Sequence, residues 1–484
     1  ILIGGSGIDT LDGGDGDDIF TLSGDGDNVT GGETGETGGD TANYAAYGSA
    51  LSVDLSVAGG GAAPDTLNEI ENVTGSATAV NTLSGSADNN ILIGGAANDV
   101  FYTAVGAGTD TFDGAGGIDE LAYLGSGITV NLLTDADTLT SIETIRLTGG
   151  SDTLTADNVA RTIYAGAGDD LFTGGTAADS FFGEAGDDTV VVSAGADVLD
   201  GGTHTGGDTL DYSGYGSGVS VNLATGVTSY GGTVTNFEHI DGTAAADTLT
   251  GDAQANTLTG NAGGDTLDGG DGDDIINGGD GNDIINGGDG NDGNDTINGG
   301  NDLDTLDYTG SASAITSGSF TGIGSVSTTN ANGDVDTISN IENFVLSNNA
   351  DTIDINTNAF TDFTSIDANS GIDHINVNGV GANSLTSLGL EGSDFASLFS
   401  DVEELDFTGA DLDGADTFDI DNDNIDAITG VAGGDLTIFV NTGTIGLADI
   451  NVLTASGATI TGDNTVGSTR TIDWDNGSQL VVQG

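Results

Sequence analysis

Residues 260–286 read GNAGGDTLD, GGDGDDIIN and GGDGNDIIN, which are three consecutive units of nine residues. The units follow the pattern G-G-x-G-x-D-x-U-x, in which U is a large aliphatic residue, and the first unit departs from it only by Asn261 at its second position. The register extends outward to residues 242–307, with three residues inserted in GGDGNDGNDTIN, and it returns at 4–30, 76–122 and 165–200. Because no unit can bury its own apolar side chain, a repeat of this kind indicates a solenoid in which neighbouring units stack.

The nine-residue unit has a direct structural interpretation. Its glycines allow the first six residues to turn tightly, with backbone angles that other residues avoid. The last three residues predict a short strand whose central U side chain points inward. If successive units occupy alternate edges, two units make one coil, and parallel strands stack about 4.8 Å apart. The sequence therefore predicts an all-β fold, a parallel β-roll or β-solenoid.

A second, longer module lies between the nonapeptide blocks and recurs four times. Its first half carries DTANY (40–44), DELAY (119–123), DTLDY (208–212) and DTLDY (304–308). Its second half carries IENV (70–73), IETI (142–145), FEHI (237–240) and IENF (341–344). Runs such as LSVDL (51–55), ITVNL (128–132) and VSVNL (219–223) predict longer strands, so we interpret the modules as wider rungs of the same solenoid. The recurring tyrosines are expected to be packing residues.

The repeats suggest a division of the chain. Residues 1–345 are predicted to form the solenoid, with modules at about 1–75, 76–150, 151–241 and 242–345. Residues 346–430 are predicted to form degenerate rungs, in which DHINV (373–377) and VEELDF (402–407) are a fifth copy. Residues 431–484 are richer in β-branched residues and are predicted to be a C-terminal β cap or assembly domain, which ends in a hairpin that turns at Asn476-Gly477.

Charge sets the strongest constraint on chemistry. The chain has 78 Asp and Glu against 3 Lys and Arg, a formal net charge of −75 over 484 residues. Disorder is the simplest interpretation of such a balance, but 36% of the residues are hydrophobic and they recur at regular intervals. A folded chain then needs cations from solution. Asp is a short, hard oxygen ligand that suits calcium, and the absence of Cys excludes disulfides and thiolate metal sites.

The aspartate at the sixth position is the predicted calcium ligand, because glycine-rich turns expose carbonyl oxygens beside it. Turns two units apart stack on one edge, which predicts the pairs Asp9–Asp27, Asp170–Asp188, Asp179–Asp197, Asp265–Asp283 and Asp274–Asp292. The full set of predicted metal ligands is Asp9, Asp18, Asp27, Asp99, Asp110, Asp119, Asp170, Asp179, Asp188, Asp197, Asp247, Asp265, Asp274, Asp283, Asp292 and Asp304. Asn90 and Asn256 occupy the same position and predict weaker sites, since they lack a charge.

The nonapeptides resemble the repeats-in-toxin (RTX) family of secreted, Gly/Asp-rich calcium proteins of Gram-negative bacteria, and the DTxxY…IEN modules resemble those of large RTX surface proteins. The resemblance implies a parallel β-roll, calcium-driven folding after export, and type I secretion through a C-terminal signal. It also implies an extracellular or bacterial cell-surface location. No acylation or pore-forming segment is evident, so toxin activity is not implied.

The function that these features favour is structural rather than enzymatic. We find no H-E-x-x-H signature and no G-x-S-x-G signature, and repetition makes each carboxylate pair a metal turn rather than an acid–base couple. The acidic charge excludes nucleic acid as a partner, and no apolar stretch is long enough to span a membrane. The expected function is a self-assembling S-layer or filament subunit. The alternatives are an adhesin segment that binds a surface glycan or protein, and the folding module of an exported hydrolase.

Overall fold

The computed structural model describes most of the chain up to residue 311 and shorter stretches beyond it. The described residues are 1–32, 35–57, 65–106, 108–286, 293–311, 314–315, 318–320, 326–329, 335–356, 365–367, 373–378, 399–400, 402, 404–406, 419–420, 435–439, 451–452, 460–466, 469–474 and 479–483. They form two compact units, one of residues 1–211 with 226–237 and one of residues 212–225 with 238–484. The module boundaries predicted from the sequence stay predictions.

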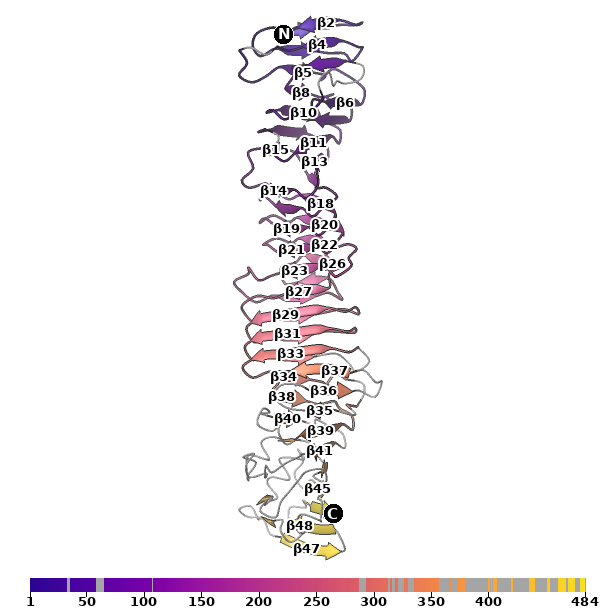
Figure 1. Cartoon of the computed structure of the whole chain (residues 1–484), viewed down its shortest axis with the longest axis vertical. Coiled ribbons are helices and arrows are strands. Elements are labelled where there is room, and N and C mark those ends of the chain that lie inside the picture. The colour runs from indigo at the N-terminus through magenta and orange to yellow at the C-terminus, as the bar shows by residue number, and fades with distance from the viewer. Residues whose placement is uncertain are drawn as a thin grey trace. The chain divides into compact units, whose positions relative to one another are not determined.

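The first unit is a β-solenoid of short parallel strands in stacked columns (Figure 1). One column contains β1 (Leu2–Ile3), β3 (Ile19–Thr21), β5 (Thr41–Asn43), β8 (Asn72–Thr74), β10 (Ile91–Gly95), β12 (Thr111–Ala115) and β15 (Thr138–Thr140). A second contains β6 (Leu51–Asp54), β9 (Asn81–Ser84), β11 (Val100–Ala104), β13 (Glu120–Leu124), β16 (Thr144–Arg146), β18 (Thr162–Ala167), β20 (Ser180–Ala185), β22 (Val198–Asp200) and β26 (Thr233–Thr235). Two shorter columns contain β2 (Thr10–Asp12), β4 (Asn28–Thr30) and β7 (Thr66–Asn68), and β14 (Thr129–Asn131), β17 (Thr153–Thr155), β19 (Leu171–Thr173), β21 (Thr189–Val191) and β23 (Thr209–Asp211).

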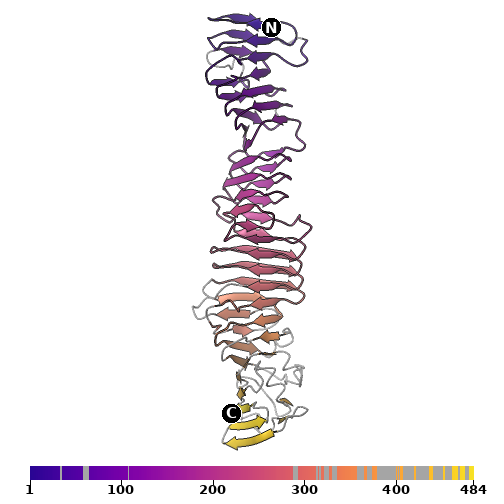
Figure 2. The same cartoon turned by 180° about the vertical axis from the view of Figure 1, so that it is seen from behind.

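The second unit repeats this architecture. One column contains β24 (Ser220–Asn222), β28 (Thr248–Thr250), β30 (Thr266–Asp268), β32 (Ile284–Asn286), β34 (Thr305–Asp307), β38 (Asn343–Val345), β40 (Ser365–Asp367) and β42 (Phe399–Ser400). The other contains β27 (His239–Asp241), β29 (Thr257–Ala262), β31 (Ile275–Asp280), β33 (Thr296–Asn301) and β37 (Val335–Ser339). Figure 2 shows the regular stacking of this part of the chain from behind.

The register confirms two nonapeptides per coil. Thr257 of β29 pairs with Ile275 of β31, and Thr266 of β30 pairs with Ile284 of β32, both in parallel and eighteen residues apart. The central side chain of each strand points inward, so that Leu258 and Ile276 are fully buried. Each buried aliphatic side chain of this kind contributes about 1.5–3 kcal/mol. The predicted all-β solenoid and its inward U residues are therefore confirmed.

The DTxxY…IEN modules belong to the same solenoid, and only some of their strands are longer than three residues. Strand β6 has four residues and β13 has five, whereas β8, β14, β16 and β24 have three each. Two of the modules also start new columns, since β6 pairs with β9 and β14 pairs with β17. The recurring Tyr44, Tyr123, Tyr212 and Tyr308 are between 0 and 7% exposed, which confirms them as packing residues.

The described strands near the C-terminus change from parallel to antiparallel pairing. Here β47 (Ile460–Val466), β48 (Thr469–Trp474) and β49 (Gln479–Gln483) pair as consecutive antiparallel neighbours, and β49 also pairs in parallel with β45 (Asp435–Phe439). The predicted terminal hairpin corresponds to β48 and β49, and its turn lies outside the described residues. In the described part of the chain, no helix is long and apolar enough to cross a membrane.

Candidate calcium sites

The carboxylate at the sixth position of each unit lies against the main chain of the neighbouring coil. Asp265 is 1% exposed, and its Oδ1 accepts a hydrogen bond of 2.7 Å from the backbone N–H of Asp247. The N–H of Asp265 in turn donates to Oδ1 of Asp283 at 2.8 Å. Each carboxylate therefore reaches back to the coil before it, and the acidic side chains form a ladder along the edge of the solenoid.

Four of the five predicted stacked pairs are neighbours in this ladder. The N–H to Oδ1 distances are 2.8 Å for Asp9–Asp27, 2.8 Å for Asp170–Asp188, 2.9 Å for Asp179–Asp197 and 2.8 Å for Asp265–Asp283. The fifth pair is wrong, because the N–H of Asp274 donates to Oδ1 of Asp295 at 2.8 Å. Asp292 lies outside the described residues. The insertion supplies a second Gly-Asn-Asp, and the residue that directly precedes β33 takes the ladder position.

The second carboxylate oxygen of many ladder residues is buried without a hydrogen-bond donor. Among the described residues this holds for Oδ2 of Asp27, Asp40, Asp119, Asp170, Asp179, Asp188, Asp265, Asp283 and Asp304. Their surroundings are rich in oxygen: a Cβ built on Gly278 would lie 2.3 Å from Oδ2 of Asp283 and 2.4 Å from the carbonyl oxygen of Gly299. A buried ionised oxygen beside a carbonyl oxygen is costly unless a cation joins them. An all-oxygen donor set of this kind fits calcium.

Burial and mutual repulsion raise the pKa values of three ladder carboxyls in particular, those of Asp170, Asp188 and Asp304. Burial, with the charges of neighbouring aspartates, raises the pKa of Asp188 to about 7 and that of Asp170 to about 6. Burial also raises the pKa of Asp304 to about 7, with smaller contributions from Asp283 and Glu342. A raised carboxyl pKa means that the folded chain disfavours the charged form. The folded ladder therefore requires positive charge at neutral pH, from a metal ion or from protons.

Replacement of the first glycine of a nonapeptide with alanine tests whether the space beside the sixth-position carboxylate is needed for calcium binding. We expect Gly278→Ala to weaken calcium binding at Asp283 and to destabilise β31 and β32, because its Cβ would lie within 2.3 Å of Oδ2. The loss should exceed the roughly 0.5–1 kcal/mol that separates Gly from Ala in regular structure. Gly216→Ala, in the same compact structural unit of the chain, is the matched control, since nothing lies within 4 Å of its added Cβ. Calcium titration followed by circular dichroism compares the two variants, and equal titration midpoints would contradict the assignment.

The remaining predicted ligands differ in their surroundings. Asp99 and Asp247 have a donor to the second oxygen, because Gly95 N–H and Thr243 N–H each donate to Oδ2 at 2.6 Å. Oδ2 of Asp110 lies 3.4 Å from the Thr103 hydroxyl. Asp9 and Asp18, in the first coils, are only partly buried, whereas Asp197 is 6% exposed. The assignment of these residues as metal ligands stays a prediction.

The glutamates of the IEN segments join the ladder, which the sequence alone did not indicate. The N–H of Asp40 donates to Oε2 of Glu71 at 2.7 Å, and Glu143 accepts in the same way from Asp119 at 2.9 Å. Glu342 repeats the contact with Asp304 at 2.9 Å. The signal was present in the recurrence of a glutamate, within IEN, IET or FEH, at a varying distance after each DTxxY segment. The longer side chain and the varying distance concealed its equivalence to the sixth-position aspartate.

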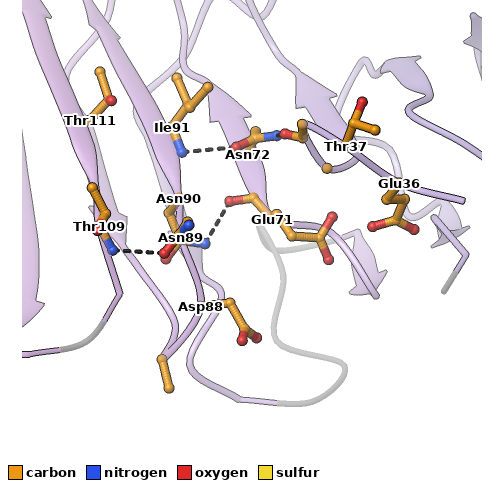
Figure 3. Close-up of a pocket in the computed structure, with 13 residues that line it drawn as sticks. Glu36, Thr37, Glu71, Asn72, Asp88, Asn89, Asn90, Ile91, Thr109 and Thr111 are labelled. Atoms are coloured by element: carbon orange, nitrogen blue, oxygen red, sulfur yellow. Dashed lines mark hydrogen bonds between the residues drawn. The ribbon is translucent and has the colours of Figure 1, made fainter. Parts of the chain in front are cut away.

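Two clusters of three carboxylates lie in the first coils. One joins Asp25, Asp27 and Asp65, and the other joins Glu36, Asp40 and Glu71, with one oxygen from each residue within 4.8 Å of the others. The second cluster borders a pocket of about 570 Å³ that Asp88, Asn89 and Thr109 also line, and Figure 3 shows the carboxyl groups of Glu36 and Glu71 side by side there. Both clusters extend the oxygen-rich edge beyond the regular nonapeptides.

Comparison with known proteins agrees with this geometry. The family model of the RTX calcium-binding nonapeptide repeat (four copies) matches residues 1–33, 78–107, 162–190, 173–203, 236–267, 259–293 and 289–310. A comparison with curated proteins finds no significant match. Among solved structures, the extracellular lipase LipA from Serratia marcescens matches at 13% identity over 49% of this chain with a TM-score of 0.16. The match spans 38% of the lipase chain, and a similarity this low carries no structural argument.

The stacked coils, the buried carboxylate ladder and the family match together show that the chain contains RTX calcium-binding nonapeptide repeats in several segments. The ions are multiple, because the matched repeats occur in several separate segments of the chain.

Proposed function

We propose that the chain is a secreted structural protein of the bacterial cell surface or extracellular matrix, which assembles with copies of itself when calcium is present. The observation that carries the proposal is the ladder of buried carboxylates in a chain with only three Lys and Arg. Such a chain folds where calcium is abundant, and extracellular calcium modules bind with dissociation constants of about 10⁻⁴–10⁻³ M. Export of an unfolded chain by type I secretion, followed by folding outside, is consistent with that requirement.

Calcium also affects contacts between copies. With a net charge of −75, two copies repel each other at low ionic strength, and divalent ions between surface carboxylates remove that repulsion. Exposed aliphatic residues on the strands, such as Ile91, Ile275 and Ile284 at 43–47% exposure, add apolar surface. Both features support assembly in calcium, as in an S-layer or a filament. We propose no enzymatic role for the chain.

Two other functions compete with this proposal. An adhesin segment would bind a surface glycan or another protein as separate molecules, without forming an ordered assembly. A calcium-dependent folding module of an exported hydrolase would gain its activity from a catalytic domain elsewhere in the same polypeptide. Neither alternative requires copies of the chain to associate, so the state of assembly in calcium distinguishes them from the structural role.

Electron microscopy of the purified chain tests the proposal. We expect ordered sheets or filaments in millimolar calcium, and we expect them to dissolve after chelation with EDTA, because the bridging ions are removed. Magnesium at the same concentration is the control for general charge screening. Folded, monodisperse particles in calcium would overturn the structural role and favour an adhesin or carrier module.

A further inference from the structure

In the loop that follows an IEN strand, a residue of the same loop donates hydrogen bonds to the loop's carboxylate. In the loop after β16, Thr148 donates to Asp152 from its N–H to Oδ2 at 2.7 Å and from its hydroxyl to Oδ1 at 2.9 Å. In the loop after β27, Thr243 donates to Asp247 in the same way, at 2.6 and 3.0 Å. Both carboxyl oxygens of these two aspartates therefore have hydrogen-bond donors, whereas in Asp265 only Oδ1 has one.

The loop after β8 follows the same plan with an amide. The N–H of Ser76 donates to Oδ1 of Asn81 at 2.7 Å, and Nδ2 of Asn81 donates back to the Ser76 carbonyl oxygen at 3.0 Å. Asn81 is fully buried, so these contacts satisfy it inside the solenoid. Three modules therefore place a serine or threonine where the nonapeptides have glycine.

The second loop of each of these coils contains a nitrogen donor at the sixth position. Asn90 donates from Nδ2 to the carbonyl oxygen of Glu71 at 2.7 Å, and Asn256 donates to the carbonyl oxygen of Glu238 at 3.3 Å. Arg161 occupies the corresponding position and donates from its guanidinium group to the carbonyl oxygen of Ile142. In all three cases the acceptor belongs to the preceding coil.

Arg161 shows most clearly what these donors replace. It is 5% exposed, and its Nε and Nη2 atoms donate to the two carboxyl oxygens of Asp157 at 3.0 and 2.7 Å. Its backbone N–H keeps the ladder contact, to Oδ1 of Asp179 at 3.0 Å. The partly exposed carboxylate of Asp157 and the carbonyl oxygen of Ile142 are thus joined by a positive group of the chain itself. A calcium ion in the same place would be repelled by the guanidinium charge.

We propose that three coils of the solenoid are free of metal, and that hydroxyl, amide and guanidinium donors of the chain take the place of calcium there. Each of these coils still pairs in parallel with the next one, β8 with β10, β16 with β18 and β27 with β29. The metal-free coils separate the calcium-binding loops into blocks, such as Asp170–Asp197 and Asp265–Asp304. The proposal goes beyond the structural function above. It reinterprets Asp247, which the sequence predicted as a calcium ligand, and Asn90 and Asn256, which the sequence predicted as weaker calcium sites.

The substitution Asn256→Asp distinguishes a metal-free loop from a weak calcium site, because the two predict opposite changes in stability and in the number of bound ions. If the loop is metal-free, the variant loses the donor to Glu238 and places a carboxylate oxygen against that carbonyl. We then expect an unchanged number of bound calcium ions in native mass spectrometry. We also expect amide exchange in β28 and β29 to be at least tenfold faster at both 1 and 10 mM calcium. A gain of one ion, or slower exchange than in the unmodified chain, would overturn the proposal.

Asp283→Asn is the matched control, because it makes the reverse change at a sixth position whose Oδ2 has no donor. It should lose at least one calcium ion, and its faster exchange should recover as calcium rises, since mass action favours the loaded state. Arg161→Gln provides a second test in the other unit if Asn256→Asp does not fold. We expect it to exchange faster around β16 and β18 with the same ion count, and a gained ion would again contradict the proposal.

Discussion

Removal of calcium from the purified chain at pH 7.5 is expected to abolish most of its β-sheet signal in circular dichroism and to expand the chain severalfold in volume. The described residues include nine ladder carboxylates with a buried, unpartnered Oδ2, among them Asp188 and Asp283. Without ions these charges repel one another across neighbouring coils, in a chain with a net charge of −75. Net stabilities of domains are only about 5–15 kcal/mol, so a few uncompensated buried charges suffice to unfold them.

Small-angle scattering and circular dichroism in EDTA measure this transition, and restoring calcium should reverse it. Magnesium is the informative control, because it demands near-octahedral geometry and gives up its water reluctantly. We therefore expect magnesium to restore much less structure than calcium at equal concentration. A compact chain with full β-sheet signal in EDTA at pH 7.5 would contradict the role assigned to the ladder.

The second large effect concerns pH, and its sign depends on calcium. In EDTA, we expect the chain to regain β-structure as the pH falls from 8 to 5. The pKa of Asp304 is raised to about 7 and that of Asp265 to about 6 in the fold, above their ordinary value of 3.8. A carboxyl group whose pKa is raised in the fold contributes to stability when the pH lies below its pKa in the unfolded chain. That contribution is lost as the pH rises through its pKa in the folded chain. Protons thus partly replace the missing ions.

In calcium the expected trend is the opposite. Protons compete with calcium for the same oxygens, so the loaded chain should lose stability as the pH falls over the same range. Urea midpoints at pH 8, 7, 6 and 5, with calcium and with EDTA, give the two curves, which should converge toward low pH. Measurements stop at pH 5 because the chain approaches its isoelectric point of about 4.1 and becomes poorly soluble. Parallel curves in the two conditions would show that the ladder carboxyls bind neither protons nor calcium in the fold.

The regular part of the fold follows from the sequence because one nine-residue rule sets both the turn and the strand. The rule predicted the inward position of Leu258 and the pairing of Asp265 with Asp283, and both are observed. It failed at the insertion, where the register alone does not decide between Asp292 and Asp295. The strand that follows Asp295 decides, because Asp295 directly precedes β33 just as Asp265 and Asp283 directly precede β30 and β32.

It was harder to predict which loops require metal, because the aspartate spacing is the same in the calcium-binding loops and in the loops that we propose to be metal-free. Asp247 and Asp265 both occupy the sixth position, but Thr243 supplies donors to the first, and Oδ2 of the second has none. The difference depends on one neighbouring side chain and on the turn that it stabilises. The role of Glu71 was hidden for a similar reason, since it reaches the ladder from a turn of a different shape, after Glu69 with a φ of 53°.

The backward reach of each carboxylate gives the solenoid a polarity. The N–H of Asp265 donates to Asp283 of the following coil, whereas the N–H of the next residue, Thr266, donates to the carbonyl oxygen of Asp247 in the preceding coil. A shortened chain that is cut on the carboxyl side of a coil would lose these acceptors and leave amide donors open at its new end. A cut on the amino side frees the carboxylate oxygen of the first remaining coil, and it also removes the acceptors of strand N–H groups such as that of Thr266. A truncated chain therefore exposes an amide donor of the ladder at a cut on the carboxyl side and a carboxylate oxygen of the ladder at a cut on the amino side.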